Sequence, residues 1–146
     1  VIVEGTDVFT PVLHDAEESL AEGLRARIGR RRAPDGLAAA LAAVDATLAD
    51  RQRDAVVRST EVGVLVLTGG PGTGKTTTLR AIAAVHEALQ RRVVLAAPTG
   101  RAAKRMTEAT GREARTLHRL LEWSPGTGDF ARGDDHPLDA DVVIVD

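Results

Sequence analysis

One stretch of eight residues sets most of what this chain can fold into. Residues 69–76 read Gly-Gly-Pro-Gly-Thr-Gly-Lys-Thr and fit the pattern G-x-x-x-x-G-K-[ST], which forms a phosphate-binding loop. An apolar run of strand length, Val62–Leu67, precedes the loop, and the spacing of apolar residues after it predicts a helix over Thr76–Gln90. A strand, a glycine-rich loop and a helix in this order are typical of a nucleotide-binding site.

The residue types of this loop suit a phosphate chain and a magnesium ion. Glycines let the backbone turn its N–H groups toward an anion, and the start of a helix adds further unpaired N–H groups. Lys75 is expected to reach the β- and γ-phosphates, and the hydroxyl of Thr76 is expected to ligate Mg²⁺. The alternative is a glycine-rich connector with an incidental lysine.

Two residues outside the loop are further candidates for the same site. Asp146 follows the apolar run Val142–Val145, and an aspartate at the tip of such a strand helps to hold Mg²⁺ in P-loop enzymes. The alternative for Asp146 is a simple surface aspartate. Gln52 lies upstream of the loop, and its amide could pair with N6 and N7 of adenine. A lone glutamine on a helix is ordinarily a polar surface residue.

The order of elements predicts an α/β fold. Apolar runs of strand length that alternate with helices favour a parallel sheet with helices on both of its faces. The predicted elements after the loop helix are a strand at 93–97, a helix at 100–110 that Thr99 caps and Gly111 ends, a short helix at 116–121, an exposed loop or hairpin at 124–137 and a strand at 140–146.

Residues 1–46 are predicted to form a small, mostly helical lead-in segment, and the domain boundary is placed between residues 46 and 47. Short β-prone runs at 1–3 and 8–9 precede an amphipathic helix over 12–29. The basic run 30–32 is interpreted as a solvated helix end, with contact to DNA phosphates as the alternative. The apolar face of the first helix is expected to consist of Leu13, Ala16, Leu20, Leu24 and Ile28, and further helices are expected at 37–44 and 50–59.

Composition narrows the functional classes. Hydrophobic residues make up 43% of the chain and aromatic residues 2%, so the core must consist of Ala, Val and Leu. The formal net charge of −2 gives no overall argument for nucleic acid, and the lack of cysteine excludes disulfides. Without a membrane-span or signal-peptide pattern, we expect a cytoplasmic protein with no membrane partner. Because the chain begins at Val1 and stops at Asp146, we expect it to be part of a longer one.

The segment 99–105, Thr-Gly-Arg-Ala-Ala-Lys-Arg, offers a hydroxyl, a helix start and three cations. These groups suit a phosphodiester backbone, although an ordinary capped helix with solvated charges is the alternative. His118 on the short helix is ordinarily interpreted as a core or capping histidine. Trp123, the only tryptophan, either stacks on a base or anchors the loop.

Taken together in order, Gln52 and the segments 67–78, 97–106, 116–121 and 142–146 resemble the RecD-like DNA helicases of superfamily 1B. The lead-in at residues 9–17 resembles that of the stand-alone members. The resemblance implies that residues 47–146 are an incomplete first RecA-like motor domain. It also implies ATP-driven 5′-to-3′ movement along single-stranded DNA, a duplex with a 5′ overhang as substrate, and a second motor lobe outside this sequence.

The resemblance implies a role for each matching residue. Lys75 and Asp146 would be catalytic, and Thr76 and Asp146 would hold Mg²⁺. Ala49 stands where the family often caps the glutamine helix with a polar residue, so we expect Thr47 or Asp50 to cap it instead. The resemblance implies that ATP contacts Gln52, Gly70, Gly72, Thr73, Gly74, Lys75, Thr76 and Thr77, and that single-stranded DNA contacts Thr99, Gly100, Arg101, Thr116 and His118.

Two other functions remain open at this point. One is a P-loop kinase or another non-motor nucleotide enzyme, which would need a substrate lid and no contacts with DNA. The other is an assembly module that depends on a nucleotide and never translocates. Stimulation of ATP hydrolysis by single-stranded DNA would distinguish the helicase from both.

Overall fold

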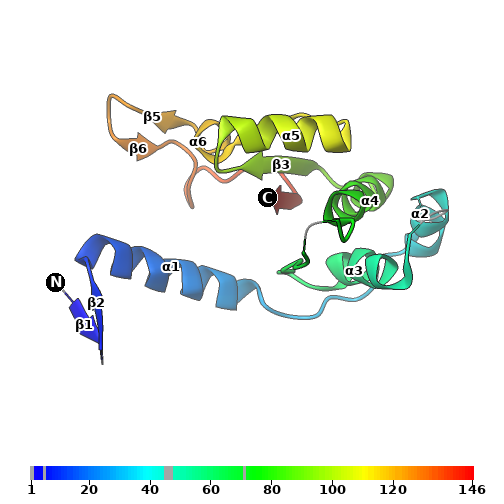
Figure 1. Ribbon diagram of the computed structural model, residues 1–146, viewed down its shortest axis with the longest axis horizontal. Helices are drawn as coiled ribbons and strands as arrows, with labels where there is room; N and C mark the ends of the chain where they lie inside the picture. The colour runs from blue at the N-terminus through cyan, green and yellow to red at the C-terminus, as the bar shows by residue number, and fades with distance from the viewer. Residues whose placement is uncertain (1, 5, 45–47, 71) are drawn as a thin grey trace.

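The structure is a computed structural model that describes residues 2–4, 6–44, 48–70 and 72–146. The centre of the molecule is a parallel three-stranded sheet (Figure 1). Strand β3 (Val93–Ala97) lies between β4 (Ala114–Thr116) and β7 (Val142–Val145). Leu95 pairs with Ala114 on one side and with Ile144 on the other. The small and branched apolar side chains of β3 suit a central strand because neighbours cover it on both edges.

Helices pack around this sheet, which confirms the predicted parallel α/β fold, while the hairpin near the N-terminus lies away from it (Figure 1). Strand β4 was not predicted, since its sequence Ala-Arg-Thr has no run of apolar residues and it forms by pairing with β3. The helices are α1 (Pro11–Arg27), α2 (Leu37–Val44), α3 (Asp50–Glu61), α4 (Lys75–Ala88), α5 (Gly100–Thr110) and α6 (Leu117–Leu120), and the antiparallel hairpins are β1 (Ile2–Glu4) with β2 (Asp7–Phe9) and β5 (Trp123–Ser124) with β6 (Asp129–Phe130).

Helix α4 lies in the middle of the hydrophobic core and contacts α2, α3, α5 and β3 (Figure 1). Val85 of α4 and Val56 of α3 are fully buried, and the core extends through Leu95 to Met106 of α5 and Ile144 of β7. Each such side chain contributes about 1.5–3 kcal/mol when it leaves water. The helix that follows the glycine-rich loop is therefore fixed by packing on several sides.

The strand predicted at Val62–Leu67 is not a strand in the structure, and this prediction was wrong. Val62 makes an isolated antiparallel bridge with Arg30, while residues 64–67 pair with no strand of the described residues. A cavity of about 600 Å³ is lined by Leu65, Val66 and Leu67 and, opposite, by residues of β7. Neighbouring strands must lie about 4.8 Å apart to share hydrogen bonds. The apolar run therefore has the composition of a strand but no neighbour with which to form one.

Helix α1 is present as predicted, but its apolar face is not packed. No residue of α1 is buried, and Figure 1 shows the helix beside the rest of the molecule rather than on the sheet. The chain after α1 meets residues 61–63, where Gly63 N donates to Gly29 O at 3.3 Å. The predicted domain boundary at 46/47 lies outside the described residues. Among those that are described, no helix combines the length and apolarity needed to cross a membrane.

A buried histidine connects α4 to α3. The imidazole of His86 is 1% exposed, and Arg91 Nη1 donates to its Nδ1 at 3.1 Å. Because a guanidinium can only donate, Nδ1 must accept, and the ring proton is therefore on Nε2. Nε2 lies 3.1 Å from Ser59 Oγ of α3, and that hydroxyl donates to Val56 O at 2.6 Å. Burial, together with the positive charge of Arg91, lowers the pKa of His86 from 6.5 to about 4.

This lowered pKa makes the stability of the fold depend on pH. Between pH 6.5 and pH 4 the unfolded chain binds a proton at His86 and the folded chain does not, so stability falls as the pH falls through this window. We expect a loss of about 3 kcal/mol from this residue in urea unfolding between pH 7 and pH 4. The His86→Gln variant should lose much less over the same range.

Thr110→Val is the matched control for this pH dependence. It removes a buried hydroxyl that donates to Met106 O at 2.7 Å, and it should lower stability by a similar amount at every pH. If His86→Gln showed the same fall in stability with pH as the unchanged protein, the buried imidazole would not be its source.

Candidate functional site

The glycine-rich loop has the backbone that its sequence predicts. Gly72 and Gly74 have φ angles of +77° and +79°, a region that residues with side chains rarely adopt. Thr73 Oγ1 donates to Gly70 O at 2.8 Å and braces the loop from inside. A Cβ at Gly69 would lie 2.6 Å from that hydroxyl oxygen, so a side chain at Gly69 would displace the brace. The loop thus keeps its shape through glycines and one threonine.

Lys75 is the first residue of α4, and its ammonium group reaches back over the loop. Lys75 Nζ donates to Gly69 O at 2.5 Å and to Gly70 O at 3.0 Å. These carbonyls hold the positive charge beside the loop, and no carboxylate of the described residues pairs with it. An anion bound at the helix start would draw the ammonium from the carbonyls, since a charge-assisted hydrogen bond to phosphate is the stronger one.

The structure brings Gln52 to the end of the loop. A Cβ on Gly74 would lie 2.3 Å from Gln52 Nε2, so the amide rests directly against this glycine. Gln52 Oε1 accepts a hydrogen bond from Ala49 N at 3.0 Å and thereby caps α3 itself. The expectation of a cap from Asp50 was therefore wrong, and Thr47 lies outside the described residues. A carbonyl oxygen has a second lone pair, so Gln52 retains acceptor capacity for a ligand.

Asp146 and Lys75 line the same cavity of about 600 Å³. Asp146 follows the last residue of β7, and its N–H donates to Ala96 O at 3.1 Å, which fixes the carboxylate at the carboxyl end of the sheet. Thr76 and Thr77 are exposed in the first turn of α4, whereas Thr78 turns inward and donates to Gly74 O at 3.1 Å. Lys75 and Asp146 therefore line one cavity, while the loop glycines and the hydroxyls of Thr76 and Thr77 lie next to Lys75 but outside its lining. A lysine, a carboxylate and nearby hydroxyls are groups that fit a magnesium–nucleotide complex.

The threonines predicted to contact DNA lie at the same end of the sheet. Ala97, which ends β3, pairs with Thr116, which ends β4, and Thr99 follows β3. Thr99 Oγ1 accepts from Ala102 N and Thr116 Oγ1 accepts from Arg119 N, each at 3.2 Å, so both cap a helix. Each hydroxyl keeps a hydrogen that it can donate outward.

Gly100 and Arg101 begin α5 directly after Thr99, and both are exposed. A Cβ built on Gly100 would meet no atom within 4 Å, so the backbone here is open to a ligand. In the strand order β4–β3–β7, Asp146 stands at one end of the sheet edge and Thr116 at the other. The topology therefore places the candidate nucleotide and DNA residues along one edge, where parallel sheets bind their ligands.

His118 is neither a core residue nor a cap. It is exposed on α6, and its ring lies 6.0 Å from that of Trp123 and 5.9 Å from that of Phe130. Phe130 was not predicted from the sequence as part of this group. The available signal was that two of the three aromatic residues of the chain fall in a stretch of turn-forming residues.

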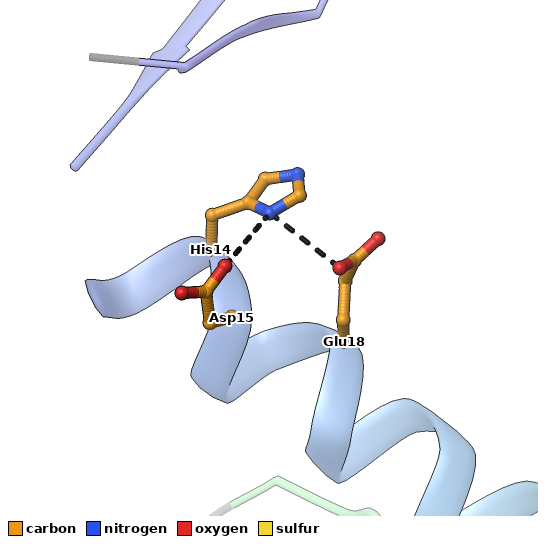
Figure 2. Close-up of side chains that lie close together, drawn as sticks. All are labelled: His14, Asp15 and Glu18. Atoms are coloured by element: carbon orange, nitrogen blue, oxygen red, sulfur yellow. Dashed lines mark ion pairs between the residues drawn. The ribbon is translucent and has the colours of Figure 1, made fainter. Parts of the chain in front are cut away.

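A separate polar cluster lies on α1. Figure 2 shows the imidazole of His14 between two carboxylates, with Nδ1 3.8 Å from Asp15 Oδ1 and 3.7 Å from Glu18 Oε2. The three ligand atoms lie within 4.8 Å of one another. Both carboxylates are well exposed, and both distances are longer than a hydrogen bond. This imidazole and the Phe9 ring also meet in a T-shaped arrangement, with centroids 5.5 Å apart.

The comparisons with known proteins agree with this geometry. Residues 52–146 match the family model described as AAA domain. The chain is 51% identical over 83 residues to the ATP-dependent RecD2 DNA helicase of Deinococcus radiodurans, which covers 57% of this chain and 11% of that protein. It is 42% identical over 120 residues to the RecBCD enzyme subunit RecD of Mycobacterium tuberculosis, covering 66% of this chain and 21% of that protein.

The RecBCD enzyme subunit RecD of Haemophilus influenzae is 34% identical over 122 residues, with 66% of this chain and 19% of that protein covered. The chain thus spans about a tenth to a fifth of the length of these curated relatives. The similarity supports the RecD-like resemblance, and the match to the family model includes the glycine-rich loop and both candidate sites.

Proposed function

Because this chain belongs to the AAA domain family of P-loop NTPases, we propose that it is the nucleotide-binding part of an ATP-dependent DNA helicase. The observation that carries the proposal is that Lys75 and Asp146 line one cavity, while Thr99 and Thr116 lie farther along the same sheet edge. The names of the relatives, a RecD2 DNA helicase and RecD subunits, support DNA as the partner.

In this proposal the loop binds the phosphates of ATP. The N–H groups of Gly70, Gly72, Thr73 and Gly74 surround the β-phosphate, and Lys75 neutralises charge as the terminal phosphate is released. Gln52, already against Gly74, contacts the adenine. The hydroxyl of Thr76 and the carboxylate of Asp146 would hold Mg²⁺. The hydroxyl of Thr77 would bind the end of the phosphate chain. Bound Mg²⁺ would supply charge stabilisation for the phosphates.

Single-stranded DNA would lie across the other end of the edge. Thr99 and Thr116 would donate their hydroxyl hydrogens to phosphates, and the N–H groups at the start of α5, with Gly100 and Arg101, would bind an adjacent phosphate. Helix α4 carries Lys75 at its start, and α5 carries Arg101 and packs against α4. A change in the nucleotide at one helix start is therefore transmitted to the other through a packed core.

The proposal includes the finer properties of the resemblance. These are 5′-to-3′ movement on single-stranded DNA, a duplex with a 5′ overhang as substrate, a second motor lobe beyond this sequence and a cytoplasmic location. The kinase and assembly alternatives have no comparable support, because neither gives a reason for hydroxyls and cations along the edge next to the nucleotide cavity.

The experiment that tests the proposal measures ATP hydrolysis by the intact protein with and without single-stranded DNA. We expect DNA to stimulate hydrolysis. We also expect Arg101→Ala to weaken DNA binding and to lower the slope of log affinity against log salt concentration by about one, the equivalent of one phosphate contact. Nucleotide affinity should be unchanged in this variant. Arg25→Ala, an exposed arginine on α1, is the matched control and should leave DNA binding as it was. Hydrolysis that is indifferent to DNA would rule out the helicase in favour of the kinase.

A further inference from the structure

The hairpin of β5 and β6 gathers most of the aromatic side chains of this chain. The sequence contains two phenylalanines, one tryptophan and no tyrosine, and Trp123 faces Phe130 across the hairpin. Their ring centroids lie 4.8 Å apart, and His118 of α6 contacts both rings. We call His118, Trp123 and Phe130 the aromatic cluster.

The aromatic cluster leaves large ring surfaces in water. Trp123 and Phe130 are each 39% exposed, and neither belongs to the hydrophobic core around α4. The indole plane makes angles of 83° with His118 and 59° with Phe130, so neither of these rings stacks in parallel on it. Rings that served only to anchor the hairpin would gain more stability from full burial. Their exposure leaves a flat, apolar surface available to a ligand.

The hairpin holds these rings in place before any ligand arrives. At its base, Glu122 Oε1 accepts from Arg132 Nε at 2.9 Å and from Arg132 Nη2 at 2.6 Å. Ala131 N donates to Glu122 O at 3.2 Å, and Gly128, with φ of +70°, closes the turn by donating to Ser124 O at 2.9 Å. A ligand that binds to rings already held in this way loses little additional conformational entropy.

The position of the aromatic cluster identifies the kind of ligand. Thr116 caps α6, the helix that carries His118, and therefore lies next to the cluster at the sheet edge. The exposed guanidinium of Arg119 adds a positive charge on the same helix. A flat apolar surface beside a hydroxyl and a cation complements a nucleotide, in which a flat base is joined to a phosphate.

We propose that the aromatic cluster is a stacking site for one unpaired base of single-stranded DNA, with Trp123 as the platform. This inference rests on the proposed function. It adds a contact with a DNA base to the predicted contacts of Thr99, Gly100, Arg101 and Thr116, which are all with the DNA backbone. The contact is independent of base identity, since every base has a π-face.

The tryptophan makes the proposal directly measurable. Trp123 is the only tryptophan of this sequence, so its fluorescence, corrected with the Trp123→Phe variant, reports on the platform. An oligothymidylate and an abasic oligomer of equal length are compared, because the second has the phosphates but no bases. We expect the oligothymidylate to quench the fluorescence and the abasic oligomer to leave it unchanged, while fluorescence anisotropy of labelled oligomers confirms that both bind.

Variants give a second readout. Trp123→Ala should weaken binding of the oligothymidylate about tenfold or more, whereas binding of the abasic oligomer should change less than about twofold. Trp123→Phe should retain most of the affinity, and Phe9→Ala, in the other hairpin, should have no effect. If Trp123→Ala does not fold, the comparison of quenching by the two oligomers in the unchanged protein still decides whether a base stacks on Trp123.

The outcomes separate this inference from the proposed function. If DNA binds but quenching is absent, or is equal with the abasic oligomer, the aromatic cluster is no stacking site and the helicase proposal stands. If neither oligomer binds the intact protein at any salt concentration, both the proposed function and the stacking site are overturned.

Discussion

Replacing Lys75 with alanine is expected to lower the affinity for ATP about a hundredfold and to abolish DNA-stimulated ATP hydrolysis. Lys75 Nζ is held by two loop carbonyls and pairs with no carboxylate in the part of the chain that the structure describes, so its charge is available to the phosphates. Removing one partner of a desolvated charge pair costs about 2–5 kcal/mol, and about 2.7 kcal/mol corresponds to this change in affinity. Titration with a fluorescent ATP analogue measures the first effect, and phosphate release measures the second.

The fold should survive this substitution, because the side chain lies at the exposed start of α4. Lys104→Ala is the matched control, since Lys104 is an exposed lysine on α5 whose nearest carboxylate is Glu108 at 3.9 Å. It should leave ATP affinity unchanged. Equal affinity for ATP in the Lys75→Ala variant and the unchanged protein would remove this loop from the nucleotide site.

Gly74→Ala is expected to cost about 1–2 kcal/mol of stability and to lower ATP affinity at least tenfold. The φ of +79° puts an alanine in a strained left-handed conformation, which accounts for the loss of stability. The new methyl group would also lie 2.3 Å from Gln52 Nε2, so the amide must move away from the loop. Nucleotide binding then loses both the shape of the loop and the contact that Gln52 is proposed to make with adenine.

Gly111→Ala separates these two effects. Gly111 ends α5 with a similar φ of +70°, but a Cβ there would meet no atom within 4 Å, and the residue lies outside the loop. It should lose about the same stability in urea unfolding and keep its ATP affinity. If the two variants bound ATP equally well, backbone strain alone would account for the effect of Gly74→Ala, and Gln52 would have no part in the site.

The sequence predicts well the elements whose pattern is local. Thr99 caps α5 and Gly111 ends it, because a hydroxyl before a helix and a glycine after it satisfy the end groups of that helix alone. The glycine-rich loop has its expected backbone for the same reason. The hairpin at 123–130 also follows from its turn-forming residues.

Features that depend on distant neighbours were not predictable in this way. Val62–Leu67 has the composition of a strand, but a strand also requires a paired neighbour, and β7 lies across a cavity. The reverse holds for β4, where Ala-Arg-Thr pairs with β3 without an apolar pattern. The polar cap of α3 is local by contrast, since Gln52 reaches back three residues to Ala49 N, as the third residue of a helix does in a capping box.

The candidate site divides in the same manner. Lys75, Thr76 and the loop glycines follow from one motif, and their roles toward a nucleotide stay predictions. The contact between Gln52 and Gly74 joins segments that are far apart in sequence, and the grouping of His118 with Trp123 and Phe130 depends on how the hairpin packs on the helix before it. Only the packing of α3 on α4, and of the hairpin on α6, brings these residues together.

The most direct test is a crystal structure of the protein with Mg²⁺ and a non-hydrolysable ATP analogue. The phosphates should lie against the main-chain N–H groups of residues 69–76, with Lys75 Nζ moved from the carbonyls of Gly69 and Gly70 to the terminal phosphate. Asp146 should lie on the side of the metal, and Gln52 beside the adenine. An analogue bound elsewhere, with Lys75 still on its two carbonyls, would contradict the account.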